Sequence, residues 1–250
     1  MASAATDIQR NTKIIYIEGN IGSGKTTFVS LLKDYLKLKN LKYTIVKEPV
    51  DEWMNTKDSS GTNILEYFYS NQNKWSYAFQ MNSFISRVKS INDARNTNEY
   101  DIIFVERSVY TDRYCFAENC YQLGNMTEIE YNIYINWHDW LCENFNTKAN
   151  GYVYLKTSPI ISHERVNKRL RDGESGIELE YLESLHFKHN ACNLVTLSAC
   201  GIKLKISPNF CLLKSPSSPA TITVLLSLSA AYVVKAYKSL KNCASSITII

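Results

Sequence analysis

One glycine-rich run carries the clearest chemical signal in this sequence. It has the form G-x-x-x-x-G-K-[ST], in which glycines allow a tight loop whose backbone N–H groups surround a phosphate at the positive end of the following helix. We expect Lys25 to reach the β- and γ-phosphates of a nucleoside triphosphate and Thr26 to offer its hydroxyl to Mg²⁺. The phosphate-binding residues that the run predicts are Gly19, Asn20, Ile21, Gly22, Ser23, Gly24, Lys25, Thr26 and the following Thr27.

Two acidic residues follow apolar runs that have the composition of buried strands. Glu106 follows residues 102–105, and Glu48 comes shortly after residues 43–46. Because the carboxyl ends of parallel strands meet at one edge of a sheet, we expect both carboxylates beside the glycine loop. Glu106 would serve the metal ion, and Glu48 would accept the proton of an attacking alcohol. Either could instead be an ordinary strand-end charge, but the adjacent phosphate motif favours the chemical interpretation.

Cationic side chains for the phosphates occur much later in the chain. Arg165 and Arg169 stand four residues apart, on one face of a predicted helix, and Arg171 follows them. Planar guanidinium groups match phosphoryl oxygens better than an ammonium group does. A solvated basic helix face is the alternative, and the intact phosphate motif favours a role with the donor.

A repeated pattern of strands and helices would position these groups. Continuous apolar runs predict strands buried on both faces of a parallel sheet, at residues 14–17, 43–46, 102–105 and 152–155. Periodic apolar residues between and after them predict helices at 28–36, 75–95, 128–145, 160–170 and 178–189. Strand and helix in alternation indicate an α/β fold, in which helices flank a mostly parallel sheet.

The charge of the chain is unevenly distributed. The 250 residues are 45% hydrophobic and 21% charged with a net charge of +4, but residues 191–250 contain six Lys and no acidic residue. The basic balance therefore comes from the end of the chain, and we expect no nucleic-acid partner. The uncharged stretch 215–234 opens with Ser and Pro and offers too few apolar residues for a span of about 20, so we expect no membrane anchor.

The cysteines and the change of composition bear on location and domains. Seven Cys without C-x-x-C spacing, and no recognisable signal peptide, favour reduced thiols in an intracellular and cytoplasmic protein, with nuclear or mitochondrial location left open. We divide the chain into a flexible arm (1–12), a P-loop domain (13–190) and an atypical tail (191–250). An exchanged exon, a shifted reading frame and an unusual extension all remain possible origins of the tail.

Several motifs in register give the chain a resemblance to a known family. From about residue 13 to residue 190 it resembles the cellular deoxynucleoside kinases, nearest to the deoxycytidine, deoxyadenosine and deoxyguanosine kinases. The motifs are Gly19 to Thr26, Glu48-Pro49-Val50 with Trp53, Phe79-Gln80, Glu106-Arg107-Ser108 with Asp112-Arg113-Tyr114, Arg165-x-x-x-Arg169-x-Arg171, and Leu179-Glu180-Tyr181-Leu182. The resemblance implies a three-layer P-loop kinase fold with an arginine-rich lid, ATP or another triphosphate as donor, Mg²⁺, and a homodimer.

The resemblance also implies roles for single residues. Glu48 would be the base that accepts the proton of the 5′-hydroxyl, Arg107 would orient it, and Lys25 would act on the donor phosphates. Gln80 would pair with the nucleobase, since a side-chain amide offers a donor and an acceptor together. The remaining substrate contacts would be stacking by Trp53, Phe79 and Phe116, and binding of the sugar 3′-hydroxyl by Tyr69 and Glu174. Each aromatic residue could equally be plain core.

Arg87 and Asp112 bear on which base is accepted. In the family, Arg and Asp at these places accompany cytosine or purine acceptance, and thymidine-preferring members carry smaller or apolar residues. A structural salt bridge is the alternative.

The histidines at 163, 186 and 189 have no other metal-ligand residues in a binding pattern near them. We expect them at the surface or at helix ends.

The sequence departs from the family after residue 189. Family members continue with a further helix, a fifth strand and an acidic loop that contacts the donor base, whereas here no acidic residue follows. Residues 221–226 or 231–234 could replace the fifth strand. Without such a strand, the fourth would have an open edge.

The sequence hypothesis is phosphoryl transfer from a triphosphate to the 5′-hydroxyl of a deoxynucleoside, deoxycytidine or a purine deoxynucleoside. One alternative is a nucleoside monophosphate kinase, although Glu48 would repel an acceptor phosphate. Another is a non-catalytic relative, such as the kinase-like accessory subunit of respiratory complex I, or a product inactivated by its tail. The hypothesis requires the carboxylates of Glu48 and Glu106 to share one edge of the sheet.

Overall fold

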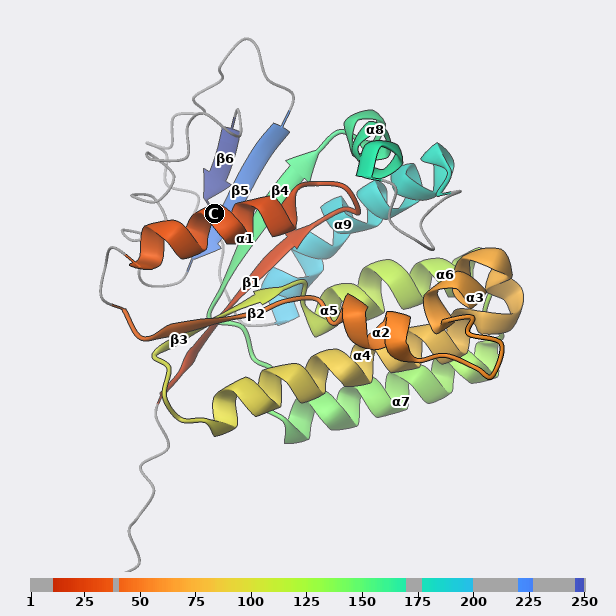
Figure 1. Ribbon diagram of the computed structural model, residues 1–250, viewed down its shortest axis with the longest axis horizontal. Coiled ribbons are helices and arrows are strands. Elements are labelled where there is room, and N and C mark those ends of the chain that lie inside the picture. The colour runs from red at the N-terminus through yellow and green to blue at the C-terminus, as the bar shows by residue number, and fades with distance from the viewer. Residues whose placement is uncertain (1–10, 38–40, 170–176, 200–219, 227–245, 250) are drawn as a thin grey trace, which may run out of the picture.

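A parallel sheet forms the centre of the molecule (Figure 1). The computed structural model describes residues 11–37, 41–169, 177–199, 220–226 and 246–249, with side chains up to residue 191. Four parallel strands run in the order β2-β3-β1-β4, and all four were predicted. Their bounds are β1 Lys13–Gly19, β2 Tyr43–Val46, β3 Ile102–Glu106 and β4 Gly151–Thr157.

The prediction that all four strands are buried on both faces is wrong for β2. Only Val46 of this strand is buried, and its other three residues are partly exposed. The reason is position: β2 is the edge strand of the sheet and has β3 as its one neighbour.

Two further strands extend the sheet on the other side. β5 (Ala220–Leu226) pairs antiparallel with β4 along its whole length, and β6 (Ser246–Ile249) pairs parallel with β5. Residues 221–226 therefore do form a strand, and residues 231–234 lie outside the described residues. Because β5 pairs with β4, the fourth strand does not have the open edge that absence of a fifth strand would leave.

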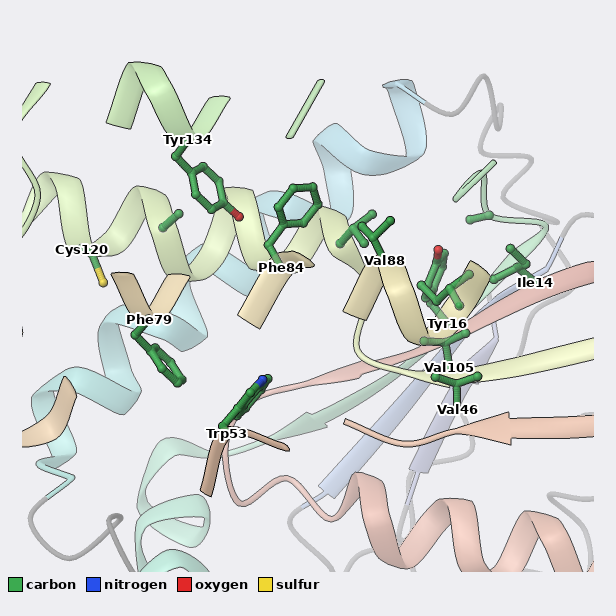
Figure 2. Close-up of a cluster of buried hydrophobic side chains, with 14 of the residues drawn as sticks. Ile14, Tyr16, Val46, Trp53, Phe79, Phe84, Val88, Val105, Cys120 and Tyr134 are labelled. Carbon is green, nitrogen blue, oxygen red and sulfur yellow. The ribbon is translucent and has the colours of Figure 1, made fainter. Parts of the chain in front are cut away.

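Helices cover both faces of the sheet, which gives the three layers expected. Alternate residues of β1 point to opposite faces. Ile15 and Ile17 pack against α1 (Lys25–Lys37), and Ile14 and Tyr16 belong to the larger core on the other face. Figure 2 shows this larger core, which includes Phe84 and Val88 of α4 (Gln72–Asn96) together with Ile14 and Tyr16 of the sheet. On the other side of α4, Tyr134 of α7 (Glu128–Asn144) packs on Phe84, with ring centres 5.8 Å apart.

The long helices were predicted and the short ones were not. The predicted helix at 178–189 continues further than expected, because α9 spans Leu179–Ala199 and crosses the proposed boundary at 190. The prediction for 160–170 corresponds to α8 (Pro159–Arg169). The unpredicted helices are α2 (Val50–Asn55), α3 (Ile64–Ser70), α5 (Val109–Thr111), the π-helix η1 (Asp112–Ala117) and α6 (Glu118–Gln122). No helix among the described residues is long and apolar enough to span a membrane.

Candidate active site

The glycine loop joins β1 to α1 and packs closely against α8. Gly22 has φ +73°, and a Cβ there would lie 2.4 Å from the backbone oxygen of Ser162. The Asn20 side chain donates to the carbonyl of Leu182 in α9 and accepts from the N–H of Ile21, both at 2.8 Å. The loop is therefore held by the two helices that follow β4, and only glycine fits at position 22.

Lys25 is buried inside this loop, and among the described residues no carboxylate pairs with it directly. Its Nζ donates to the carbonyl oxygens of Gly19 at 3.0 Å and Asn20 at 2.9 Å. Burial, assisted by the nearby Arg107 guanidinium, lowers the pKa of Lys25 to about 7. A buried cation satisfied only by carbonyls favours the arrival of an anion. The geometry suits a phosphate group, which would return this pKa toward its ordinary value.

Thr26 and Glu106 form a pair of oxygen ligands beside Lys25. Thr26 Oγ1 donates to Glu106 Oε1 at 2.8 Å, and Glu106 is buried at the end of β3. Among the described residues no cluster of three His, Cys, Asp or Glu could hold a metal ion without other ligands. One carboxylate with a hydroxyl fits Mg²⁺, which commonly takes few protein ligands and completes its shell with phosphates and water.

Glu48 lies past the end of β2, the strand next to β3. Two guanidinium groups bind the same carboxylate oxygen: Arg107 Nε donates to Oε1 at 2.9 Å and Arg87 Nη2 donates to Oε1 at 3.0 Å. Burial opposes ionisation of Glu48, but the charges of Arg107 and Arg87 outweigh it and hold the pKa of Glu48 well below its usual range. Glu48 is therefore ionised, with Oε2 not bound by either guanidinium.

Arg107 occupies an unusual backbone conformation directly after β3. Its φ is +69°, in the left-handed region that L-residues seldom adopt. From there the side chain reaches Glu48 and the carbonyl of Gly19, and its guanidinium lies 4.5 Å from the centre of the Phe116 ring. Arg107 thus connects the carboxylate, the glycine loop and the aromatic wall of the site.

Glu18 belongs to the same neighbourhood, and sequence reasoning missed it. It is the penultimate residue of β1 and is only 3% exposed. Its Oε1 accepts from the backbone N–H of Ser108 at 2.9 Å, and its buried Oε2 has no hydrogen-bond partner. An acidic residue directly before the glycine loop was the available signal.

One cavity of about 490 Å³ brings most of the predicted residues together. Those that line it are Ile21, Gly22, Gly24, Lys25, Thr26, Thr27, Glu48, Trp53, Tyr69, Phe79, Gln80, Glu106, Arg107, Asp112, Phe116, Arg165 and Arg169. The carboxylates of Glu48 and Glu106 are on the same edge of the sheet, as the hypothesis required. The lining residues to which sequence reasoning gave no role are Val50, Leu65, Phe68, Ser83 and Tyr181, although Val50 and Tyr181 stand in motifs that carry the family resemblance.

Other predicted residues lie behind the wall or outside the described residues. Gly19, Asn20 and Ser23 support the loop from behind, and Arg171 and Glu174 lie outside the part of the chain that the structure describes. Arg87 is 1% exposed and donates to Asp112, to Glu48 and to the carbonyl of Glu106. The ion pair between Arg87 and Asp112 is closed, with Nε to Oδ2 at 2.6 Å, and Asp112 is its member that reaches the cavity.

The aromatic residues serve the core and the cavity at once. Trp53 and Phe79 meet edge to face at 5.4 Å, and Phe79 stacks on Phe68 at 4.5 Å. Gln80 is 1% exposed, and its Nε2 donates weakly to Cys120 Sγ at 3.7 Å. This part of the cavity is therefore a flat-sided apolar slot with one amide at its wall.

The arginines of α8 approach the glycine loop from above the sheet edge. Arg165 Nη1 donates to the carbonyl of Ser23 at 3.3 Å, and the same nitrogen would lie 3.6 Å from a Cβ at Gly24. Arg169 lines the cavity one helical turn later. Lys25 of α1 and the two arginines of α8 therefore face the same cavity, which Arg107 also lines.

The expectation for the histidines is wrong at position 189. His163 and His186 are partly exposed, but His189 is 1% exposed and lies in mid-helix because α9 continues to residue 199. Its ring stacks on Tyr154 at 6.1 Å and meets Phe116 edge to face at 6.2 Å. His189 is thus part of the support behind the aromatic wall.

Comparison with known proteins assigns the chain to a family. The family model described as deoxynucleoside kinase matches residues 15–219. The chain belongs to the deoxynucleoside kinase family. The match extends past residue 190, where the family resemblance of the sequence motifs was expected to end. Membership makes the chain a kinase of deoxynucleosides and disfavours a non-catalytic relative.

Individual relatives agree with this assignment. Deoxycytidine kinase 2 of Gallus gallus is 38% identical over 206 residues, which cover 75% of this chain and 76% of the relative. Deoxycytidine kinase of Homo sapiens is 38% identical over 197 residues, with 72% and 74% covered. Mitochondrial deoxyguanosine kinase of Xenopus laevis is 32% identical over 209 residues, with 76% and 77% covered.

Proposed function

We propose that this deoxynucleoside kinase transfers the γ-phosphoryl group of ATP, or of another nucleoside triphosphate, to the 5′-hydroxyl of deoxycytidine or a purine deoxynucleoside. The observation that carries the proposal is the position of Glu48. Its carboxylate is held by two buried guanidinium groups on the wall of the cavity that Lys25 and Glu106 also line. A proton acceptor and a phosphate-binding loop in one cavity suit phosphoryl transfer to an alcohol.

Glu48 would take the proton that the alcohol loses. As the bond between the 5′-oxygen and the γ-phosphorus forms, the bond from this phosphorus to the leaving nucleoside diphosphate breaks. The hydroxyl proton passes to Glu48 Oε2, the oxygen that neither arginine binds. The lowered pKa of Glu48 makes it a weak base that is always ionised. A weak base suffices where the transferring phosphoryl group is loosely bonded, because the hydroxyl loses its proton late.

The cations around the cavity would hold the donor. Lys25 would bind the β- and γ-phosphates, and Arg165 and Arg169 would neutralise charge that spreads over the transferring group. Thr26 and Glu106 are the residues that would hold Mg²⁺, which when bound neutralises phosphate charge. Arg171, in the predicted lid, and Glu174, predicted to bind the sugar 3′-hydroxyl together with Tyr69, remain parts of the same proposal.

The apolar slot suits the nucleobase. Trp53, Phe79 and Phe116 provide aromatic surface for a flat ring, and Gln80 provides an amide at its edge. The carboxylate of Asp112 accepts hydrogen bonds, so it favours a base that presents an exocyclic amine, as cytosine and adenine do. Thymine presents carbonyl oxygens and a methyl group at the corresponding edge, and we expect it to bind less well.

A monophosphate acceptor suits this cavity less well. The acceptor phosphate of a nucleoside monophosphate would meet Glu48 and Glu106, whose negative charges disfavour another anion at short range. The two arginines nearest to Glu48 are already engaged with carboxylates, since Arg87 binds Asp112 and both bind Glu48. These contacts support a neutral acceptor.

We also propose that the chain forms a homodimer through α7. One face of this helix presents large apolar side chains to solvent: Ile129 is 65% exposed, Ile133 37%, Trp137 50% and Trp140 50%. The spacing of 4, 4 and 3 residues places them on one side of the helix. Apolar patches of this kind on a monomer commonly mark an interface. In the part of the chain with described side chains, Cys115, Cys120 and Cys142 are free thiols, which agrees with the intracellular location that remains a prediction.

The direct test is transfer of labelled γ-phosphate from ATP to deoxycytidine, deoxyadenosine, deoxyguanosine, thymidine and deoxycytidine monophosphate. We expect label in the monophosphates of the first three, less with thymidine, and none on the monophosphate acceptor. Labelling of deoxycytidine monophosphate but not of deoxycytidine would establish the rival function. Absence of transfer to all four deoxynucleosides would refute the proposal.

A further inference from the structure

The turn after β3 needs an external restraint. Arg107 adopts φ +69° there, a conformation that costs a non-glycine residue roughly 1–3 kcal/mol. This conformation directs the guanidinium to Glu48 and to the carbonyl of Gly19. If the turn relaxed toward an ordinary φ, the Arg107 side chain would leave the backbone in a different direction, and its contact with Glu48 would be lost.

Two consecutive N–H groups hold this turn against β1. The N–H of Arg107 donates to the carbonyl of Ile17 at 2.9 Å, and the N–H of Ser108 donates to the side chain of Glu18 at 2.9 Å. The first bond comes from the backbone of β1, and the second depends on which side chain stands at position 18. Since Ser108 is 1% exposed, water is not available to replace Glu18 as the acceptor.

Ser108 transmits the restraint further along the chain. Its Oγ accepts from the N–H of Thr111, which caps α5, and α5 leads directly into η1. Asp112 and Phe116, both in η1, line the cavity. The contact between Glu18 and Ser108 thus lies where the chain passes from β3 through α5 to η1, which contributes Asp112 and Phe116 to the cavity.

Glu18 is also costly to bury. Although the residue is 3% exposed, none of the described residues bonds to its Oε2, and an incompletely paired buried carboxylate destabilises a fold. A cost of this kind is typical of functional sites, where residues are placed for the geometry of the reaction at the expense of local stability.

We propose that Glu18 is a positioning residue for the transfer reaction. Its carboxylate accepts from Ser108, keeps Arg107 in the left-handed turn, and so aims the guanidinium at Glu48. Glu18 acts through Arg107 and does not line the cavity. The inference rests on the proposed roles of Glu48 and Arg107.

The test compares Glu18→Gln with Glu18→Met in the full chain. Both substitutions remove the charge and both side chains have nearly the same length, but only Gln keeps an oxygen that can accept from Ser108. We expect kcat of the Met variant to fall about 10²-fold below that of the Gln variant, the size of effect that misplacement of a reacting group produces. KM for the deoxynucleoside should change much less, because the aromatic slot is untouched.

A second background separates positioning from general damage. Arg107→Gly removes the guanidinium, and glycine accepts the left-handed φ without strain. In this background the Gln and Met variants should turn over at similar rates, since the group that Glu18 positions is gone. Thermal midpoints of all variants are measured alongside.

Each outcome decides the question. A kcat ratio near one in the native background, the same large ratio in the Arg107→Gly background, or loss of folding in the Met variant, the Gln variant or both would overturn the positioning role. The unsubstituted chain is assayed in parallel, so that absence of transfer in it identifies failure of the proposed function itself.

Discussion

At the scale of single residues, the two arginines that bind Glu48 have opposite effects on its proposed role as a proton acceptor. Arg107 and Arg87 keep it ionised, and the same two cations make it a poor acceptor of protons. The arrangement is productive only if the proton leaves the hydroxyl late. In the proposed reaction Glu48 would therefore serve as a fixed acceptor and orienting group for the alcohol more than as a strong base.

Replacement of Glu48 tests this directly. Glu48→Gln keeps the shape and one acceptor oxygen but removes the charge, so we expect kcat to fall about 10²- to 10⁴-fold. Deoxynucleoside binding should remain close to that of the native chain, because the aromatic slot provides most of its contact. Single-turnover transfer and calorimetric titration with deoxycytidine measure the two quantities. Undiminished turnover would remove Glu48 from the reaction.

The sequence leaves two roles open for Arg87 and Asp112, selection of the base and a structural ion pair. Joint replacement by Arg87→Leu and Asp112→Ala removes a balanced pair, and we expect the ratio of kcat/KM for thymidine to that for deoxycytidine to rise. Turnover with every nucleoside should fall as well, because Arg87 also binds Glu48. The ratio is therefore the diagnostic measurement. An unchanged ratio would assign the pair to structure alone, and Asp112→Ala, which leaves Arg87 paired with Glu48, is the control.

His189 gives a pH dependence of stability. Burial, with Arg107 and Lys25 nearby, holds the pKa of His189 well below 6.5, so the unfolded chain binds a proton that the folded chain does not. The free energy of unfolding should then fall by about 1.4 kcal/mol per pH unit below 6.5 from this residue. Urea unfolding between pH 5.5 and 7.5 measures the slope. His189→Phe should reduce it and leave the contribution of His138, whose pKa burial also lowers; an unchanged slope would contradict the assignment.

At the scale of elements, the helices and strands that could be predicted were those with long apolar runs or several periodic apolar residues. The strands and the long helices have several periodic residues each, and their packing on the sheet agrees with that pattern. The short α2, α5 and α6 have too few residues to show a period. The helix α3 did have a signal, a capping box formed by Asn63 and Glu66, and it was not used. The π-helix η1 has no signature in composition, although it sets the spacing of Asp112 and Phe116.

The close packing of the glycine loop on α8 gives a prediction for one glycine. In Gly22→Ala the new Cβ would lie 2.4 Å from Ser162 O, so the loop and α8 must separate. We expect a loss of about 1–3 kcal/mol in unfolding free energy from the overpacking, and weaker ATP binding.

The matched control is Gly124→Ala. Gly124 has φ +76°, almost the same backbone strain, but nothing lies within 4 Å of its added Cβ. Denaturant unfolding and nucleotide titration of both variants separate the effect of the steric clash with Ser162 from the effect of the positive φ, which both positions share. Equal losses in the two variants would show that the contact with α8 does not restrict the loop.

At the scale of the whole molecule, the four parallel strands and the cavity could be predicted from the sequence, but the strands beyond β4 could not be placed. Residues 221–226 were one of two candidates for a fifth strand, and β6 was not predicted. The catalytic candidates come from strand ends and one motif, where residue type and position carry the signal. The pairing of β5 with β4 joins residues more than sixty positions apart, and no local pattern in the uncharged stretch 215–234 specifies that partner. The mid-helix position of His189 was missed for the same reason, since α9 continues into a segment of changed composition.

The proposed self-association through α7 belongs to this scale, and it can be tested without changing the cavity. Trp137→Glu with Trp140→Glu places two charges on the exposed apolar face, where a second copy would have to desolvate them. We expect sedimentation velocity to give a dimer for the native chain and a monomer for this variant. Phe187→Glu, which changes a residue that is 75% exposed on α9, controls for the added charge and should leave the dimer intact. A native chain that sediments as a monomer would refute the dimer, and dissociation by Phe187→Glu instead would move the interface to α9.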